Sequence, residues 1–91
     1  MELTELRSRI DAIDSRMLEL FLERMDCARQ VAEYKQAAGL PVRDAAREEE
    51  ILCRRAAEAG TLGPEARVLF STLMELSRSL QHRLLEEKNV P

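Results

Sequence analysis

The chain has 91 residues, of which 45% are hydrophobic and 34% are charged, and its formal net charge at pH 7 is −3. This length has room for one domain, which we expect to span residues 1–91, and a domain so small buries only a modest share of its surface when it folds alone. The negative charge excludes the broad basic field that attracts nucleic acid or an anionic membrane, so a bound anion must meet a local cluster of cations.

The first predicted element is a long helix over residues 4–38. Glycine and proline are absent from this range, whereas Gly39 and Pro41 follow it directly and end it. At 1.5 Å per residue the helix is on the order of 50 Å long, which a small domain cannot cover, so we expect a partner subunit. Alternating steps of three and four residues, the spacing of a helix–helix seam, separate Leu3, Leu6, Ile10, Ile13, Met17, Leu20, Arg24, Cys27, Val31 and Tyr34.

A short second helix and a long third helix follow. Asp44 is placed to cap the second helix, which we expect to run to about residue 59, where Gly60 and Gly63 form a break. Pro64 suits the first turn of the third helix, which we expect to continue to the polar tail EEKNVP. An apolar line along it comprises Val68, Leu69, Leu73, Leu76, Leu80 and Leu84. The low content of glycine, proline and tyrosine agrees with an all-α fold of long, short and long helices.

Arg24 is the charged member of the apolar seam. A buried arginine without a partner is costly, so it either forms a structural ion pair or faces a cavity that receives an anion. Lys35 lies eleven residues further along the helix, which places it within about 20° of Arg24 around the helix axis. Two cations on one partly buried face suit a small dianion.

Arg7 lies about 25 Å along the same helix from Arg24 and about 42 Å from Lys35, too far to share a small ligand within one chain. An antiparallel pair of first helices would bring Arg7 of one subunit toward the site of the other. The other interpretation is a surface arginine near the N-terminus, and spacing alone favours it.

The stretch PVRDAAREEE over residues 41–50 has two interpretations. A proline stop, an Asp44 cap and an acidic first turn stabilised by the helix dipole explain most of it, although they explain Arg47 less well. Alternatively, Glu48 points inward beside Ile51 and accepts a hydrogen bond from a ligand hydroxyl.

Ser77 and Gln81 lie one helical turn apart beside the apolar line of the third helix. They could present a hydroxyl and an amide to the cavity that the cations face. A serine can also bond back to its own backbone, and a glutamine can lie at the edge of a seam.

The residues that would point to a metal or a disulfide framework are few. Cys27, Cys53 and the lone His82 follow no ligand spacing, so we expect no metal site and take the cysteines as buried or idle reduced thiols. No apolar run is long enough to cross a bilayer, and acidic residues occupy the segment MELTELRSRI, so we expect a cytoplasmic protein.

Four segments, in this order and spacing, carry a resemblance that covers the chain from Leu3 to Leu85. They are LRSRIDAID, LERMDCARQVAEYK, PVRDAAREEEIL and LFSTLMELSRSLQ. Together they resemble the all-helical class of chorismate mutase. The resemblance implies an intertwined homodimer with two sites that converts chorismate to prephenate, toward phenylalanine and tyrosine, without metal or cofactor.

The family's site pattern falls on Arg7, Arg24, Lys35, Asp44, Arg47, Glu48, Ser77 and Gln81, and each position carries the expected residue type. By resemblance, Arg24 and Arg7 of the partner subunit clamp the two substrate carboxylates with help from Ser77. Lys35 and Gln81 would donate to the ether oxygen of the substrate.

By the same resemblance, Glu48 and the backbone near Asp44 would hold the ring hydroxyl, while Arg47 would brace the site. Arg24, Lys35, Glu48 and Gln81 are thus the expected catalytic residues. A related isochorismate pyruvate lyase is the closest alternative, but the VRDxxRE run over residues 42–48 resembles the mutases more. A helical dimer that serves only as an interaction module is a second alternative, and it would not need Ser77 and Gln81 beside the cations.

Overall fold

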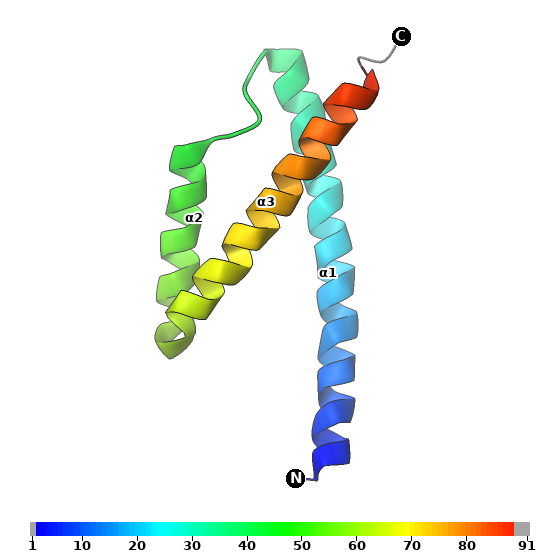
Figure 1. The fold of residues 1–91 in the computed structure, drawn as a ribbon, viewed down its shortest axis with the longest axis vertical. Helices are drawn as coiled ribbons and strands as arrows, with labels where there is room; N and C mark the ends of the chain where they lie inside the picture. The colour runs from blue at the N-terminus through cyan, green and yellow to red at the C-terminus, as the bar shows by residue number, and fades with distance from the viewer. Residues whose placement is uncertain (1, 89–91) are drawn as a thin grey trace.

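The computed structural model describes residues 2–88, which form three α-helices (Figure 1). Helix α1 spans Leu3–Ala38, α2 spans Ala45–Glu58, the 3₁₀ turn η1 spans Gly60–Leu62, and α3 spans Gly63–Lys88. The predicted order of long, short and long helices is confirmed, and no strand occurs within residues 2–88. Over the same residues, every helix is too short or too polar to traverse a lipid bilayer.

Gly39 ends α1 and Asp44 caps α2, as predicted. Gly39 adopts the left-handed conformation with φ 70°, which costs glycine little because it has no Cβ. The next amide, that of Leu40, donates to the Lys35 carbonyl at 2.8 Å. Asp44 Oδ1 accepts from the Arg47 amide at 3.0 Å and so caps α2. The cap fixes the first turn of α2, which carries Arg47 and Glu48.

The predicted break between the second and third helices is confirmed, but Gly63 is not part of it. Gly63 has helical angles, φ −52° and ψ −51°, and begins α3, while Gly60 supplies the turn with φ 60°. A Cβ at Gly63 would lie 2.9 Å from the carbonyl oxygen of Ala56, closer than such atoms approach in folded proteins. The glycine therefore allows α3 to start in close contact with the end of α2.

Helix α3 continues further than predicted. It includes Glu86 to Lys88, which we assigned to the polar tail, whereas the last residues of that tail, 89–91, lie outside the described residues. Glutamate and lysine are good helix formers, so a polar sequence alone does not end a helix.

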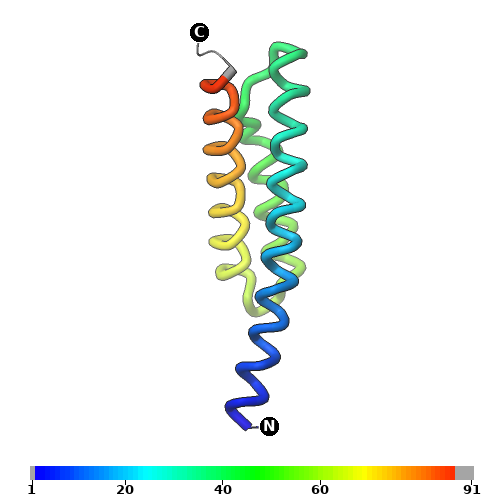
Figure 2. Tube along the Cα trace, turned by 90° about the vertical axis from the view of Figure 1, so that its right-hand side faces the viewer, coloured from blue at the N-terminus to red at the C-terminus, as the bar shows by residue number. Residues whose placement is uncertain are grey.

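The described chain is a flat layer, with extents of 56 × 29 × 14 Å. Helix α3 crosses diagonally over one side of the other two and contacts both, whereas α1 and α2 make no helix–helix contact within residues 2–88 (Figures 1 and 2). A layer this thin has almost no interior. Its buried apolar residues are Ala28, Ala32 and Met74, and no large side chain among the described residues is fully buried.

The predicted apolar seam of α1 lies open in the single chain. All side chains from Leu3 to Leu20 are exposed, for example Ile10 at 54% and Leu20 at 60%. Within the described chain, this half of the predicted helix–helix seam therefore has no packing partner. On α3, Val68 is 67% exposed, whereas Ser77 and Gln81 are buried. The buried face of α3 thus combines Met74 with the polar Ser77 and Gln81, beside the predicted apolar line.

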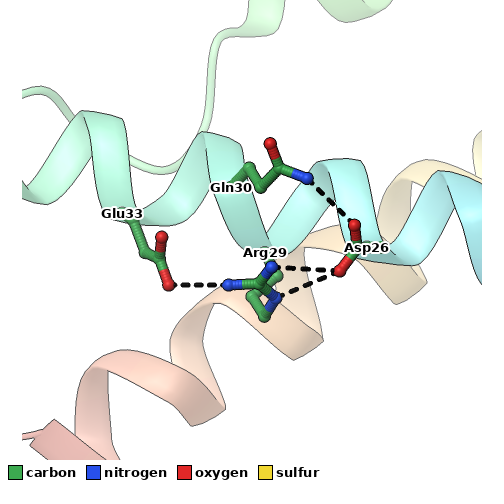
Figure 3. A network of polar contacts seen from close by, with 4 residues as sticks. All are labelled: Asp26, Arg29, Gln30 and Glu33. Atoms are coloured by element: carbon green, nitrogen blue, oxygen red, sulfur yellow. Dashed lines mark hydrogen bonds and ion pairs between the residues drawn. The ribbon is translucent and has the colours of Figure 1, made fainter.

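A polar network lies on the exposed surface of the second half of α1 (Figure 3). Arg29 pairs with Asp26 at 3.1 Å and with Glu33 at 2.8 Å, and Gln30 donates to Asp26 at 2.9 Å. Hydrogen bonds from Arg29 and then Gln30 hold the pKa of Asp26 below its usual value. The ionised Asp26 carboxylate therefore contributes a little to the stability of the folded chain. This contribution is present above the pKa that Asp26 has in the unfolded chain, and it is lost as the pH falls through the pKa in the folded chain.

Candidate functional site

Seven of the eight predicted site residues line one pocket where α1, α2 and α3 meet, which we call the three-helix pocket. Its full lining is Arg24, Lys35, Val42, Asp44, Arg47, Glu48, Met74, Ser77, Arg78 and Gln81. The eighth predicted residue, Arg7, is absent from this set. The four cationic side chains outnumber the two carboxylates, so the lining carries a formal excess of two positive charges (4 − 2 = 2). Such a pocket attracts a dianion.

Arg24 is held in the pocket by Ser77. Arg24 Nη1 donates to Ser77 Oγ at 2.8 Å, and Ser77 Oγ donates to the Leu73 carbonyl at 2.9 Å. Ser77 is only 8% exposed. The serine therefore bonds back to its own helix and faces the cation at the same time, which combines the two interpretations of this residue. Because its hydrogen is directed at the backbone, it orients the guanidinium by accepting from it.

Lys35 is fixed by the loop that follows α1. Its ammonium donates to the Val42 carbonyl oxygen at 2.7 Å, and the contact is partly buried. An ammonium has three N–H donors, so two remain for a ligand. This hydrogen bond connects the end of α1 to the loop that leads into α2. It explains why the Lys35 ammonium, although near the end of its helix, is directed toward the pocket.

Gln81 is the most buried polar side chain of the pocket, with 6% exposure. Its Oε1 atom has no hydrogen-bond partner among the described residues. A buried acceptor left unpaired costs about 1–3 kcal/mol. This oxygen can accept a hydrogen bond from a ligand or a water, and the NH2 group of the same amide can donate one.

Asp44 and Arg47 form the rim of the pocket. The Asp44 carboxylate is used as the cap of α2, so its side chain is directed at the backbone. Arg47 extends along α2 to Glu50, with 3.4 Å between Nη1 and Oε1, and both side chains are more than half exposed. The structure thus places Arg47 at the mouth of the pocket.

Glu48 projects into the pocket and pairs with Arg78 of α3. The Arg78 and Glu48 side chains retain 22% and 19% exposure, so the pair is mostly buried. The inward orientation of Glu48 agrees with the second interpretation of PVRDAAREEE. Sequence reasoning missed Arg78, because thirty residues separate it from Glu48. The available signal was its position directly after Ser77 and three residues before Gln81.

Arg7 lies near the N-terminal end of α1, whereas Lys35 lies near the other end, beside the turn that leads to α2 (Figure 1). The structure therefore does not bring Arg7 to the pocket of its own chain. This agrees with the distance argument made from the sequence.

Metal-binding residues are not gathered here. Within residues 2–88, no three histidine, cysteine, aspartate or glutamate side chains are arranged to hold a metal ion. Cys27 and Cys53 are free thiols, as expected, but both are exposed in the single chain and not buried. The pocket offers fixed cations and one amide, with Ser77 committed to Arg24, and such groups can bind and polarise an anionic ligand.

The chain is similar to several characterised proteins. The profile of the family chorismate mutase type II matches residues 6–82. A chorismate mutase of Methanocaldococcus jannaschii is 36% identical over 94% of this chain and 90% of its own length. A T-protein of Enterobacter agglomerans is 35% identical over 85% of this chain, which spans only 21% of that relative. A bifunctional chorismate mutase/prephenate dehydratase of Aquifex aeolicus is 46% identical over 55% of this chain and 14% of its own length.

Proposed function

The chain belongs to the chorismate mutase type II family, and from that premise we propose that its three-helix pocket is the site where chorismate rearranges to prephenate. As an enzyme of this family it is an isomerase that acts on chorismate in aromatic amino acid biosynthesis. We also propose that it acts in the cytoplasm. The observation that carries the site assignment is the convergence of Arg24, Lys35 and the buried Gln81 amide on one pocket with excess positive charge.

The proposed roles follow from the charges that the reaction creates. As the C–O bond of the enol ether breaks, its oxygen gains negative charge. Donors aimed at that oxygen stabilise the transition state more than the substrate, and we assign this role to Lys35 and Gln81. Arg24, braced by Ser77, binds one of the two carboxylates and holds the compact conformer in which the reacting ends meet.

The contributions expected from these groups are large enough to account for the rate acceleration of an enzyme. An acceleration of about 10⁶-fold, at the low end for enzymes, corresponds to about 8 kcal/mol. Two preorganised donors contribute roughly 3 kcal/mol each, and restriction of the substrate to one conformer supplies the remainder. Such a reaction needs neither a nucleophile nor a proton relay.

Groups of α2 complete the proposed recognition of the ring. Glu48 accepts a hydrogen bond from the ring hydroxyl, with support from the backbone near Asp44. Arg47, at the rim, shields the mouth of the pocket and adds to the positive field. The interaction-module alternative does not account for the burial of Ser77 and Gln81 beside the cations.

The second chain of the proposed homodimer covers the exposed stripe of α1. A layer 14 Å thick with apolar side chains such as Ile13 and Met17 half exposed is unstable by itself. We propose that two α1 helices pair in antiparallel orientation and that the two chains intertwine. This pairing buries the stripe and carries Arg7 of the partner subunit to the second carboxylate.

The purified protein is expected to consume chorismate and form prephenate without added metal or cofactor, because a fixed cationic pocket is all that the rearrangement requires. The loss of chorismate absorbance with time measures the reaction. Isochorismate in a parallel cuvette tests the lyase alternative, since only a lyase releases pyruvate from it. Pyruvate release from isochorismate without turnover of chorismate would overturn the proposed function.

A further inference from the structure

Arg78 lines the three-helix pocket but belongs to none of the roles assigned above. It joins α3 to α2 through its ion pair with Glu48. A second α3–α2 pair, Arg67 with Glu49 at 2.8 Å, lies outside the pocket and retains 44% and 57% exposure. The two pairs link the same helices, but only the Arg78 pair is mostly buried and faces the ligand site.

We propose that Arg78 is a positioning residue that holds the Glu48 carboxylate in the orientation needed to accept the ring hydroxyl of the substrate. This inference rests on the proposed function of Glu48. A carboxylate has two oxygens and about four acceptor directions. Arg78 Nη1 engages Oε1, which leaves Oε2 for a ligand. The guanidinium therefore fixes the side chain without using up its capacity to accept.

The charge of Arg78 has a second effect. The Glu48 carboxylate is negatively charged, and so is the proposed dianionic substrate. In a partly desolvated pocket these like charges repel one another strongly. Arg78 balances that charge from the side of α3. Without it, Glu48 would either repel the substrate or rotate toward solvent, and in both cases the contact with the ring hydroxyl would be lost.

The proposal is tested by a double-mutant cycle on chorismate turnover with Arg78→Met, Glu48→Gln and the combined variant. A lost hydrogen bond to a charged group predicts that Arg78→Met lowers kcat/KM by about tenfold or more. Because the ring contact is made in the substrate and the transition state alike, the loss is expected mainly as a rise in KM. In the Glu48→Gln background, Arg78→Met is expected to change kcat/KM by less than about twofold, since its target is already altered.

Two further variants separate positioning from a merely structural role. Arg78→Lys keeps the positive charge and the ability to donate a hydrogen bond to Glu48. Unlike Arg78→Met, it is therefore expected to have a KM within about threefold of that of the original protein. Arg67→Met removes the exposed α3–α2 pair, and it is expected to leave KM unchanged. A fall in kcat at unchanged KM would indicate loss of folded enzyme and overturn the proposal.

An equal fold-loss from Arg78→Met in both Glu48 backgrounds would also overturn it, because Arg78 would then act independently of Glu48. Turnover of chorismate by the unaltered protein is measured in the same series. Its absence would contradict the proposed function, whereas its presence together with additive effects would contradict only the role of Arg78.

Discussion

Subunits carrying Arg7→Ala and subunits carrying Arg24→Ala, each inactive as a homodimer, are expected to recover activity when they are mixed and exchange. Removal of one charged contact to a substrate carboxylate costs about 2–5 kcal/mol, which is roughly 30- to 1000-fold or more in rate. In a mixed dimer, one site receives an intact Arg24 from one chain and an intact Arg7 from the other. Random exchange therefore predicts about a quarter of the original activity.

Mass spectrometry of differently tagged subunits verifies that exchange has occurred. A mixture of the unaltered protein with the Arg7→Ala, Arg24→Ala double variant is the matched control. In its mixed dimers each site lacks one arginine, so exchange is expected to lower the activity of that mixture by about half. Complete exchange without recovery in the first mixture would rule out a site shared between subunits.

Gln81→Glu is expected to be active only at acidic pH. The amide donates at every pH, whereas a carboxyl group donates to the ether oxygen only while it is protonated. Activity of the variant should therefore rise as the pH falls through the pKa of the introduced carboxyl group. At about pH 8 the loss relative to the original protein is expected to be on the order of 100-fold, as for other single donors to a developing anion.

The measurement is a pH profile of kcat/KM for the variant and for the original protein over the range from about pH 5 to 8. Gln81→Met serves as the control, since it removes the donor at every pH and should remain low throughout. A Gln81→Glu profile parallel to that of the original protein would show that position 81 does not donate to the reacting oxygen.

Local signals in the sequence predicted the end of α1 and the start of α2 well. Gly39 needs the left-handed conformation and Asp44 offers a side-chain acceptor to free amides, so both positions follow from the chemistry of a few neighbouring residues. Gly63 shows the limit of this reasoning. Its role is to admit the backbone of Ala56 at close range, and such a contact between two helices leaves no local trace.

The pocket was predictable where its residues share a helix. Arg24 and Lys35 could be aligned from the helical repeat alone, and both line the same pocket. The ion pair between Arg78 and Glu48 joins two helices, and its existence depends on the angle at which α3 crosses α2. The buried face of α3 was also missed, because half of its apolar line, Val68, Leu69 and Leu76, is exposed in the single chain. In the proposed homodimer, part of the apolar surface of the flat chain would pack against the second chain instead.

A crystal structure with a stable dicarboxylate analogue of the chair-like transition state tests the central claim most directly. We expect one analogue in each three-helix pocket, with a carboxylate within about 3 Å of Arg24 and the other carboxylate against Arg7 of the partner subunit. The ether oxygen should face Lys35 and Gln81. An analogue bound outside this pocket, or bound within a single chain without an arginine from a second one, would contradict the account.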